Sequence, residues 1–450
     1  MTRSAGAVFA GPRDWADPGD LRSTTVELAP DADVDPFALA GGAGGLGPGV
    51  VMASRQLVLA GHGVAARLDL GRGIAGAVDG AVRRWLAAVP GGGAVAFGAL
   101  PFSPGEATAL VVPTLLYGRS ATRQWVTVVA AATAAPDDPT AGLAAATRRR
   151  EAGAGPAPRC TDVSGSPDAV FTGGVSHILD AIAAGRVTKV VLARQLVADY
   201  DAPLDVVAVL RRLRDLEPAA TVYGLIEPDG AFVGASPELL VARHGSSVES
   251  CPLAGTVGLT GEAGNDDDAL SRLVSSPKET DEHGQVVDAI VDALGPLCID
   301  RPTRSAPTVA RLRSVAHLAT RVGGTLAGTT DALALVSALH PTPAVAGTPT
   351  APAMDLLREL EPVGRGPYAG AFGWMDGRGD GEFVVAIRGA AIHGGRAVVH
   401  AGAGIVAGSD PDQELAETTL KLEVALAALS APAPASAVDA RAVPTEAAPA

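Results

Sequence analysis

Apolar residues follow two different spacings along the chain, and each spacing predicts a different element. Short runs rich in Val, Leu and Ile predict strands, and two pairs of runs that flank Gly- and Asp-containing turns predict hairpins. The expected strands are 189–197, 221–227, 231–233, 372–375, 383–387 and 397–401. The last of these runs into Gly402-Ala403-Gly404.

Two longer segments have the spacing of amphipathic helices. One starts at Ser276-Pro277, a typical helix cap, and places apolar residues at 286, 287, 290, 291 and 294. The other covers 414–429. Antiparallel hairpins mixed with separate helices predict an α+β fold built in layers rather than a doubly wound sheet.

Changes in composition divide the chain. Residues 1–20 are rich in Gly, Pro and Asp and are expected to be loose, and the Ala/Pro-rich 431–450 are expected to form a disordered tail. A weak boundary around 136–168 separates an N-terminal part, 21–160, from a C-terminal region, 168–430.

The charge balance excludes some classes of partner. The 450 residues carry a formal net charge of −14 with a pI of about 5.0, which argues against nucleic-acid binding and against anionic membrane surfaces. No apolar run is long enough to span a bilayer, and the N-terminus lacks a signal-peptide stretch. Three scattered cysteines without metal-ligand spacing favour a cytoplasmic location.

Lysine is rare in this chain. Only Lys189, Lys278 and Lys421 occur among the 35 basic residues, and the other 32 are arginine. With the excess of Ala, Gly and Pro, this indicates a coding bias that replaced lysine wherever arginine serves equally well. Arginine does not replace lysine where a group must lose its proton or act as a compact charge. For any single lysine, survival by chance is about as good an explanation as such a functional requirement.

The two predicted helices offer paired carboxylates. Glu279 and Glu282 share one helix face, as do Glu414, Glu417 and Lys421. Carboxylate oxygens are the ligands that Mg²⁺ prefers. For either helix alone, a carboxylate that faces solvent or stabilises the helix dipole is the more common explanation.

A possible base and a possible acid lie elsewhere. Lys189 opens an apolar strand and can serve as a general base, or it lies at the strand edge with its amine in water. Glu238 follows Pro237 in a turn and is a candidate protonated acid, or an ordinary residue at a helix start.

Further residues are candidates for holding an anion. Gly255-Thr256 and Gly402-Ala403-Gly404 can offer backbone N–H groups, although plain tight turns are the commoner explanation. Arg388, at the end of a predicted strand, can pair with a carboxylate. Histidines such as His317 more often have structural roles. These residues together indicate an acidic, metal-using site for a small anion and do not name a substrate.

Ten short segments in this order resemble the chorismate-binding enzyme family, which includes isochorismate, salicylate, anthranilate and aminodeoxychorismate synthases. They extend over roughly the C-terminal 260 residues, while 21–160 resembles the variable half of that fold less clearly. The segments are KVVLAR (189–194), GASPELL (234–240), PLAGT (252–256), PKETDEH (277–283), VAHLATRVGGTL (315–326), HPTPAVAGTP (340–349), GPYAGAFGW (366–374), AIRGA (386–390), HAGAGIV (400–406) and ELAETTLKLE (414–423).

The resemblance implies a fold of layered antiparallel sheets with helices packed outside, as in anthranilate synthase component I, and a role for each candidate residue. Mg²⁺ is expected at Glu282 and Glu417 directly, and at Glu279 and Glu414 through water. Chorismate is the expected substrate, with Lys189 as base and Glu238 as acid. The expected substrate contacts are Gly255, Thr256, His317, Ala344, Tyr368, Arg388, Gly402 and Lys421.

Three positions separate the subgroups of the family. The place of the nucleophilic lysine of aminodeoxychorismate synthases is Ala254 here, and anthranilate synthases typically have Gln where this chain has Lys189. Salicylate synthases typically have Thr where this chain has Ala344. The resemblance therefore implies an isochorismate synthase, expected to be a monomer without an amidotransferase subunit. Val257–Thr260 depart from an arginine-containing segment of many relatives, which puts loop contacts near the pocket in doubt.

Overall fold

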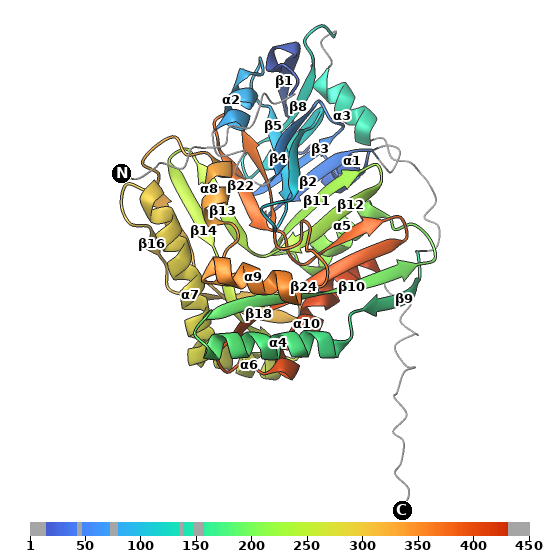
Figure 1. Cartoon of the computed structure of the whole chain (residues 1–450). Coiled ribbons are helices and arrows are strands. Elements are labelled where there is room, and N and C mark those ends of the chain that lie inside the picture. The colour runs from blue at the N-terminus through green and yellow to red at the C-terminus, as the bar shows by residue number, and fades with distance from the viewer. Residues whose placement is uncertain (1–14, 43–46, 73–79, 135–137, 148–156, 431–450) are drawn as a thin grey trace, which may run out of the picture.

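The structure is a computed structural model that describes residues 15–42, 47–72, 80–134, 138–147 and 157–430. Two large antiparallel sheets and one small sheet form its framework (Figure 1). The expected tail at 431–450, most of the expected loose N-terminus and part of the 136–168 boundary lie outside the described residues.

The largest sheet has twelve strands among the described residues. In spatial order they are β1 (Leu21–Leu28), β8 (Gln124–Ala131), β7 (Leu115–Ser120), β3 (Leu57–His62), β2 (Gly49–Ala53), β11 (Thr221–Glu227), β12 (Gly230–Ser236), β23 (Gly389–His393), β24 (Arg396–Val406), β10 (Lys189–Tyr200) and β20 (Gly347–Thr348), with β9 (Cys160–Gly165) also paired to β10.

The second sheet has nine strands, and a third sheet has three. The second runs β16 (Thr303–Arg304), β19 (Val322–Thr325), β14 (Ser247–Cys251), β13 (Leu239–His244), β22 (Gly381–Val385), β21 (Ala371–Asp376), β5 (Val95–Leu100), β6 (Ala107–Val112) and β4 (Ala66–Arg72). The third is β15 (Leu253–Gly258), β18 (Val315–Ala319) and β17 (Thr308–Arg311). Strands from before and after the 136–168 boundary share both large sheets.

The large sheets pack face to face and the helices cover their outer faces. Buried residues of β2, β3, β7 and β11 meet residues of β5, β21 and β22 in one apolar cluster between the sheets. The outer faces pack against α1 (Pro36–Gly41), α2 (Ala81–Ala88), α3 (Pro139–Thr147), α4 (Asp168–Ala183), α5 (Val206–Leu216), α7 (Pro277–Leu294), α8 (Ala332–Leu339), α9 (Thr350–Leu360) and α10 (Pro411–Leu429). The helix α6 (Ala263–Ser275) packs against the small sheet. In the described part of the chain, no helix is long and apolar enough to cross a membrane.

The helices α7 and α10 begin where local capping chemistry places them. The Ser276 hydroxyl accepts the N–H of Glu279 at 3.3 Å, and Pro277 occupies the first turn of α7. The Asp410 carboxylate accepts N–H groups at the start of α10 in the same way. All five apolar positions predicted for α7 are buried. Both predicted helices are therefore confirmed.

The predicted strands are also present, with some shifts in their ends. The strand predicted at 189–197 continues to Tyr200, and the one predicted at 383–387 ends at Val385. Arg388 lies just before β23 with a φ of 57° rather than at a strand end. The Gly402-Ala403-Gly404 and Gly255-Thr256 segments lie inside β24 and β15, so the tight-turn interpretation of both is wrong.

Candidate active site

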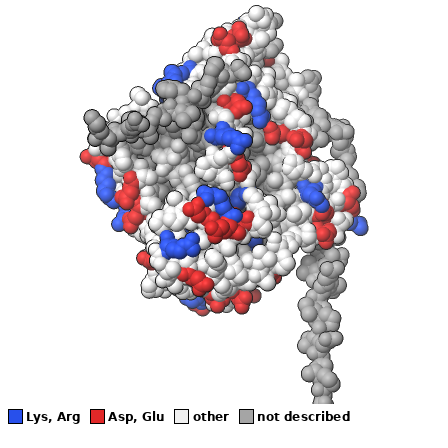
Figure 2. All heavy atoms as spheres, in the orientation of Figure 1, with Lys and Arg blue, Asp and Glu red and all other residues white. Residues whose placement is uncertain are grey.

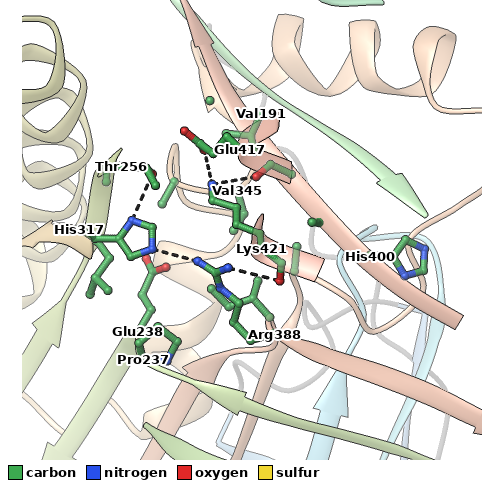
Figure 3. Close-up of a pocket in the computed structure, with 18 of the residues that line it drawn as sticks. Val191, Pro237, Glu238, Thr256, His317, Val345, Arg388, His400, Glu417 and Lys421 are labelled. Atoms are coloured by element: carbon green, nitrogen blue, oxygen red, sulfur yellow. Dashed lines mark hydrogen bonds and ion pairs between the residues drawn. The ribbon is translucent and has the colours of Figure 1, made fainter. Parts of the chain in front are cut away.

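One cavity collects side chains from the largest sheet, the small sheet, α7, α10 and the segments that connect them (Figure 3). About 720 Å³ of space outside the protein atoms lies within it, part of which is open to solvent. Of the residues proposed from sequence, those lining it are Lys189, Glu238, Gly255, Thr256, Glu282, His317, Ala344, Tyr368, Arg388, Gly402, Glu417 and Lys421. Glu279 and Glu414 lie next to it, in contact with Lys278.

Lys189 is the first residue of β10, and its side chain is only 1% exposed. Its Nζ lies 2.9 Å from Oε1 of Glu282 on α7. A Cβ at Gly404 of the neighbouring strand β24 would lie 2.4 Å from that same oxygen. Glycine is thus required there because the carboxylate lies against the strand backbone. The alternative of a strand-edge lysine with its amine in water is wrong.

Glu238 lies in the short link between β12 and β13 rather than at a helix start. Its backbone carbonyl accepts the N–H of Val385 at 3.0 Å, which ties the link to the second sheet. The residue is 4% exposed, and burial raises the pKa of its carboxyl to about 7, although the charges of Lys189 and Lys421 oppose this shift. Glu238 therefore holds a proton over much of the range near neutral pH.

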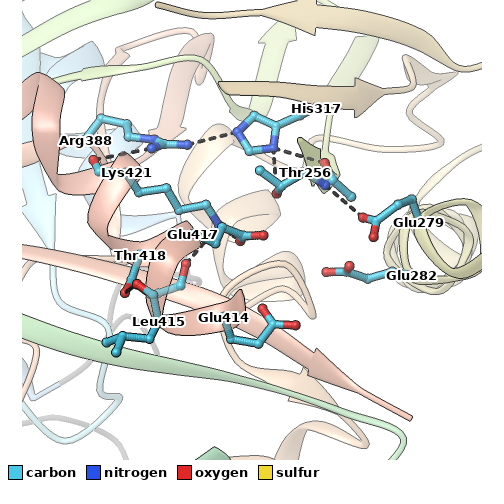
Figure 4. A network of polar contacts seen from close by, with 12 residues as sticks. Thr256, Glu279, Glu282, His317, Arg388, Glu414, Leu415, Glu417, Thr418 and Lys421 are labelled. Carbon is cyan, nitrogen blue, oxygen red and sulfur yellow. Dashed lines mark hydrogen bonds and ion pairs between the residues drawn. The ribbon is translucent and has the colours of Figure 1, made fainter. Parts of the chain in front are cut away.

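Arg388 and His317 form a buried chain of hydrogen bonds that ends at Gly255 of the small sheet (Figure 4). Arg388 donates from Nη2 to Nε2 of His317 at 2.9 Å, and His317 Nδ1 lies 3.1 Å from the carbonyl oxygen of Gly255. Burial and the Arg388 charge hold the pKa of His317 well below its usual range. The imidazole is therefore neutral, with its proton assigned to Nδ1 by these partners. Gly255 has a φ of 72° at a bulge in β15.

The helices α7 and α10 bring four carboxylates together, and we call Glu279, Glu282, Glu414 and Glu417 the acid cluster (Figure 4). Glu279 accepts the backbone N–H of Thr256 at 2.9 Å. Lys278 Nζ lies 3.5 Å from Glu414 Oε1 and 3.8 Å from Glu279 Oε1.

Lys421 completes the contacts of the cluster. Its Nζ lies 2.5 Å from Glu417 Oε1 and also donates to the carbonyl oxygen of Gly402 at 2.9 Å. Every carboxylate of the acid cluster therefore has an ammonium group within 4 Å.

The acid cluster carries more negative charge than its buried position favours. Burial raises the pKa of Glu414 to about 7, and the neighbouring Glu417 charge adds to the shift. Burial and the Glu282 charge also raise the pKa of Glu279, although the Thr256 N–H opposes them. Like charges brought together in this way favour an added cation.

The donor set suits a hard divalent cation. Within the described ranges, no three acidic, histidine or cysteine side chains surround a single point closely enough to hold a metal ion. Ammonium groups lie among the carboxylates instead, and Lys278 Nζ is within 4 Å of carboxylates from both helices. A cationic group is thus already accommodated between α7 and α10, among oxygen donors of the kind that Mg²⁺ binds.

A family model described as chorismate binding enzyme matches residues 60–430. The chain belongs to this family. A Mycobacterium tuberculosis protein with the provisional name isochorismate synthase MenF is 42% identical over 362 residues, which cover 77% of this chain and 90% of that protein. Isochorismate synthase DhbC of Bacillus subtilis is 39% identical over 267 residues, covering 58% of this chain and 67% of that protein.

The solved structures agree with this assignment. The menaquinone-specific isochorismate synthase MenF of Escherichia coli superposes with a TM-score of 0.79 at 25% identity, covering 92% of this chain and 96% of that one. The predicted α+β fold, with layered antiparallel sheets and helices outside, is confirmed as the fold of the chorismate binding enzymes.

This chorismate binding enzyme also has a buried ion pair at the cavity wall, Arg365–Glu361, that was not predicted from the sequence. Arg365 donates from Nε to Glu361 at 2.8 Å, from Nη1 to the carbonyl oxygen of Val345 at 2.8 Å, and from Nη2 to that of Val191 at 2.6 Å. Glu361 also accepts the N–H of Ala193 at 2.9 Å. The pair joins the segment that holds Ala344 to the strand that holds Lys189. Two charged residues in an otherwise Gly- and Pro-rich segment were the available signal.

Proposed function

We propose that the protein is a Mg²⁺-dependent isochorismate synthase that converts chorismate to isochorismate with water as the nucleophile. The observation that supports this most strongly is a buried lysine and a buried glutamic acid in one cavity. Lys189 and Glu238 are 1% and 4% exposed, and burial keeps Glu238 protonated up to about pH 7. Ammonia is already nucleophilic and needs no such base, whereas water does.

Lys189 and Glu238 divide the proton transfers between them. Acting as the base, Lys189 takes a proton from a water molecule as the water oxygen forms a bond to ring carbon 2. The ring double bonds shift, the bond from carbon 4 to its hydroxyl breaks, and Glu238 delivers its proton to the departing oxygen. One water enters and one leaves, so the reaction is an isomerisation, and proton exchange then restores both side chains.

Basic side chains and backbone donors suit the two carboxylates of chorismate. Arg388 has donors beyond the one that His317 accepts, and a neutral His317 orients the guanidinium without adding a competing charge. Lys421, Gly402, Gly255 and Thr256 line the same cavity. Tyr368 and Ala344 form walls against which the ring would pack.

The acid cluster is the proposed metal site, with Glu282 and Glu417 as direct ligands and Glu279 and Glu414 acting through water. Bound Mg²⁺ supplies the positive charge that holds the ring carboxylate beside four glutamates. The chain's own part is to place the carboxylates at the cavity edge and to keep Lys189 and Lys421 beside them.

We further propose that the enzyme works in the cytoplasm as a monomer, without an amidotransferase subunit, a nucleic acid or a membrane. The acidic composition supports the last two points. Over the described residues in view, acidic and basic side chains are interspersed and form no continuous basic area (Figure 2). The three cysteines are all free thiols.

Product chromatography tests this function directly. Purified protein is incubated with chorismate and MgCl₂, with and without EDTA, in ammonia-free buffer. Isochorismate that forms only with available metal is the expected result. Salicylate with pyruvate would indicate a salicylate synthase instead. Product that forms only after ammonia is added would contradict the role of Lys189.

A further inference from the structure

All three lysines of the chain contact the acid cluster. Lys189 contacts Glu282, Lys421 contacts Glu417, and Lys278 contacts both Glu414 and Glu279. Elsewhere the chain uses arginine at all 32 remaining basic positions. The proposed function gives tasks to Lys189 and Lys421 but none to Lys278. The retention of lysine at this third position therefore calls for a physical reason.

The contacts of Lys278 are loose. Its Nζ is 3.5 Å and 3.8 Å from the two carboxylate oxygens, beyond the usual length of a charge-assisted hydrogen bond. Its side chain is 39% exposed, whereas those of Glu414 and Glu279 are 6% and 14% exposed. A half-exposed ammonium group thus offsets two largely buried carboxylates while keeping part of its contact with water.

Arginine would behave differently at this position. A planar guanidinium forms two short parallel bonds to a carboxylate, and those oxygens would then be held by the protein. An ammonium group neutralises the same charge as a single point and leaves the oxygens available. A second cation can therefore displace a lysine from these carboxylates with a smaller loss of hydrogen bonding than it could displace an arginine.

We propose that Lys278 is a built-in counter-cation of the acid cluster, which stabilises the cluster when no divalent cation is bound and moderates its affinity for Mg²⁺. This inference rests on the metal site of the proposed function. Loss of the Lys278 charge should therefore have two opposite effects. It should lower the stability of the metal-free protein and raise the affinity for Mg²⁺.

The test uses the full-length protein freed of metal by chelation, with MgCl₂ alone as the ligand. Isothermal titration gives the dissociation constant, and thermal unfolding in EDTA gives the stability of the metal-free form. For Lys278→Gln we expect roughly five- to tenfold tighter Mg²⁺ binding, because a positive charge that repels the bound cation is removed. We also expect a lower melting temperature in EDTA, because the metal-free acid cluster loses a positive charge that offsets its carboxylates. Lys278→Arg should bind Mg²⁺ more weakly than the wild type.

A matched control removes one positive charge from a distant ion pair. Arg301→Gln breaks a contact to Asp292 between side chains 74% and 68% exposed, and it should leave Mg²⁺ affinity unchanged. Lower stability of Lys278→Gln without tighter binding would overturn the inference, since a merely structural residue would behave so. A wild-type protein that binds no Mg²⁺ would overturn it together with the metal site, and the product assay would then show whether the proposed reaction survives.

Discussion

Two groups of charges contact β10, and they use their charges in opposite ways. In the Arg365–Glu361 pair, each of three guanidinium nitrogens donates to the protein, and one Glu361 oxygen also accepts a backbone N–H. In the acid cluster, the positive partners are lysines that contact the carboxylates as single points.

The difference separates a structural role from a chemical one. The guanidinium of Arg365 is held in one position because each of its three nitrogens donates to a protein oxygen. Removing one partner of such a buried pair leaves an uncompensated charge. Carboxylates offset by single ammonium groups keep oxygen lone pairs that another cation can use. Arginine thus occupies the position where geometry must be held, and lysine occupies the positions where a partner must be exchanged.

The largest effect is expected at Lys189, which contacts Glu282 of the acid cluster. Lys189→Gln should lower turnover by roughly 10²- to 10⁴-fold, the usual contribution of a general base. Lys189→Arg should lower it as much, because arginine retains the charge beside Glu282 but does not give up its proton. Steady-state product formation measures both, and circular dichroism checks that the fold is retained. Near-normal turnover in either variant would exclude Lys189 as the base.

The fixed pair should respond mainly in stability. Glu361→Gln leaves the buried Arg365 guanidinium without its carboxylate, and the free energy of unfolding should fall by about 3–5 kcal/mol. Denaturant unfolding with MgCl₂ and with EDTA measures this loss. The loss should be equal in the two buffers, because the pair lies outside the acid cluster.

The acid cluster supplies the opposite control. Glu417→Gln should abolish activation by Mg²⁺ while it changes the free energy of unfolding in EDTA by about 1 kcal/mol or less, since Glu417 and Lys421 are partly exposed. If Glu417→Gln instead unfolds the protein and Glu361→Gln removes the metal response, the comparison between the two groups is wrong.

The features that sequence could predict are those with a local cause. The Ser276 cap, the hairpin turn at Pro228-Asp229 and the apolar face of α7 each depend on neighbours within a few residues. The candidate site was predicted from the order of the family motifs, and the structure brings its proposed residues to the lining of one cavity, apart from Glu279 and Glu414, which lie next to it. Their individual roles remain predictions.

The features that sequence missed depend on contacts between distant segments. Gly404 lies within a strand, and a Cβ there would meet the carboxylate of Glu282, which belongs to α7 and lies more than a hundred residues earlier in the chain. Arg365 gave no clear signal because two of its partners are backbone carbonyls, which any residue can supply. Nor does any short-range pattern reveal that Lys278 contacts a second helix.

The proton on Glu238 makes the stability of the protein depend on pH. Its pKa is about 7 in the folded protein against 4.5 as the ordinary value, so folding takes up a proton between these pH values. The resulting stabilisation is fully present below pH 4.5 and is lost as the pH rises through about 7. The stability of the wild type relative to Glu238→Gln should therefore fall by roughly 3 kcal/mol across this window.

Turnover gives a second measurement of the same proton. Wild-type activity should decline above about pH 7 as Glu238 loses the proton that it donates, whereas the slower Glu238→Gln enzyme should lack that decline. Unfolding curves for the two proteins at several pH values separate this from any titration of the base. Parallel stability curves would mean that Glu238 is ionised in the folded state. Glu238 could then not act as the acid, and another group would have to protonate the departing hydroxyl.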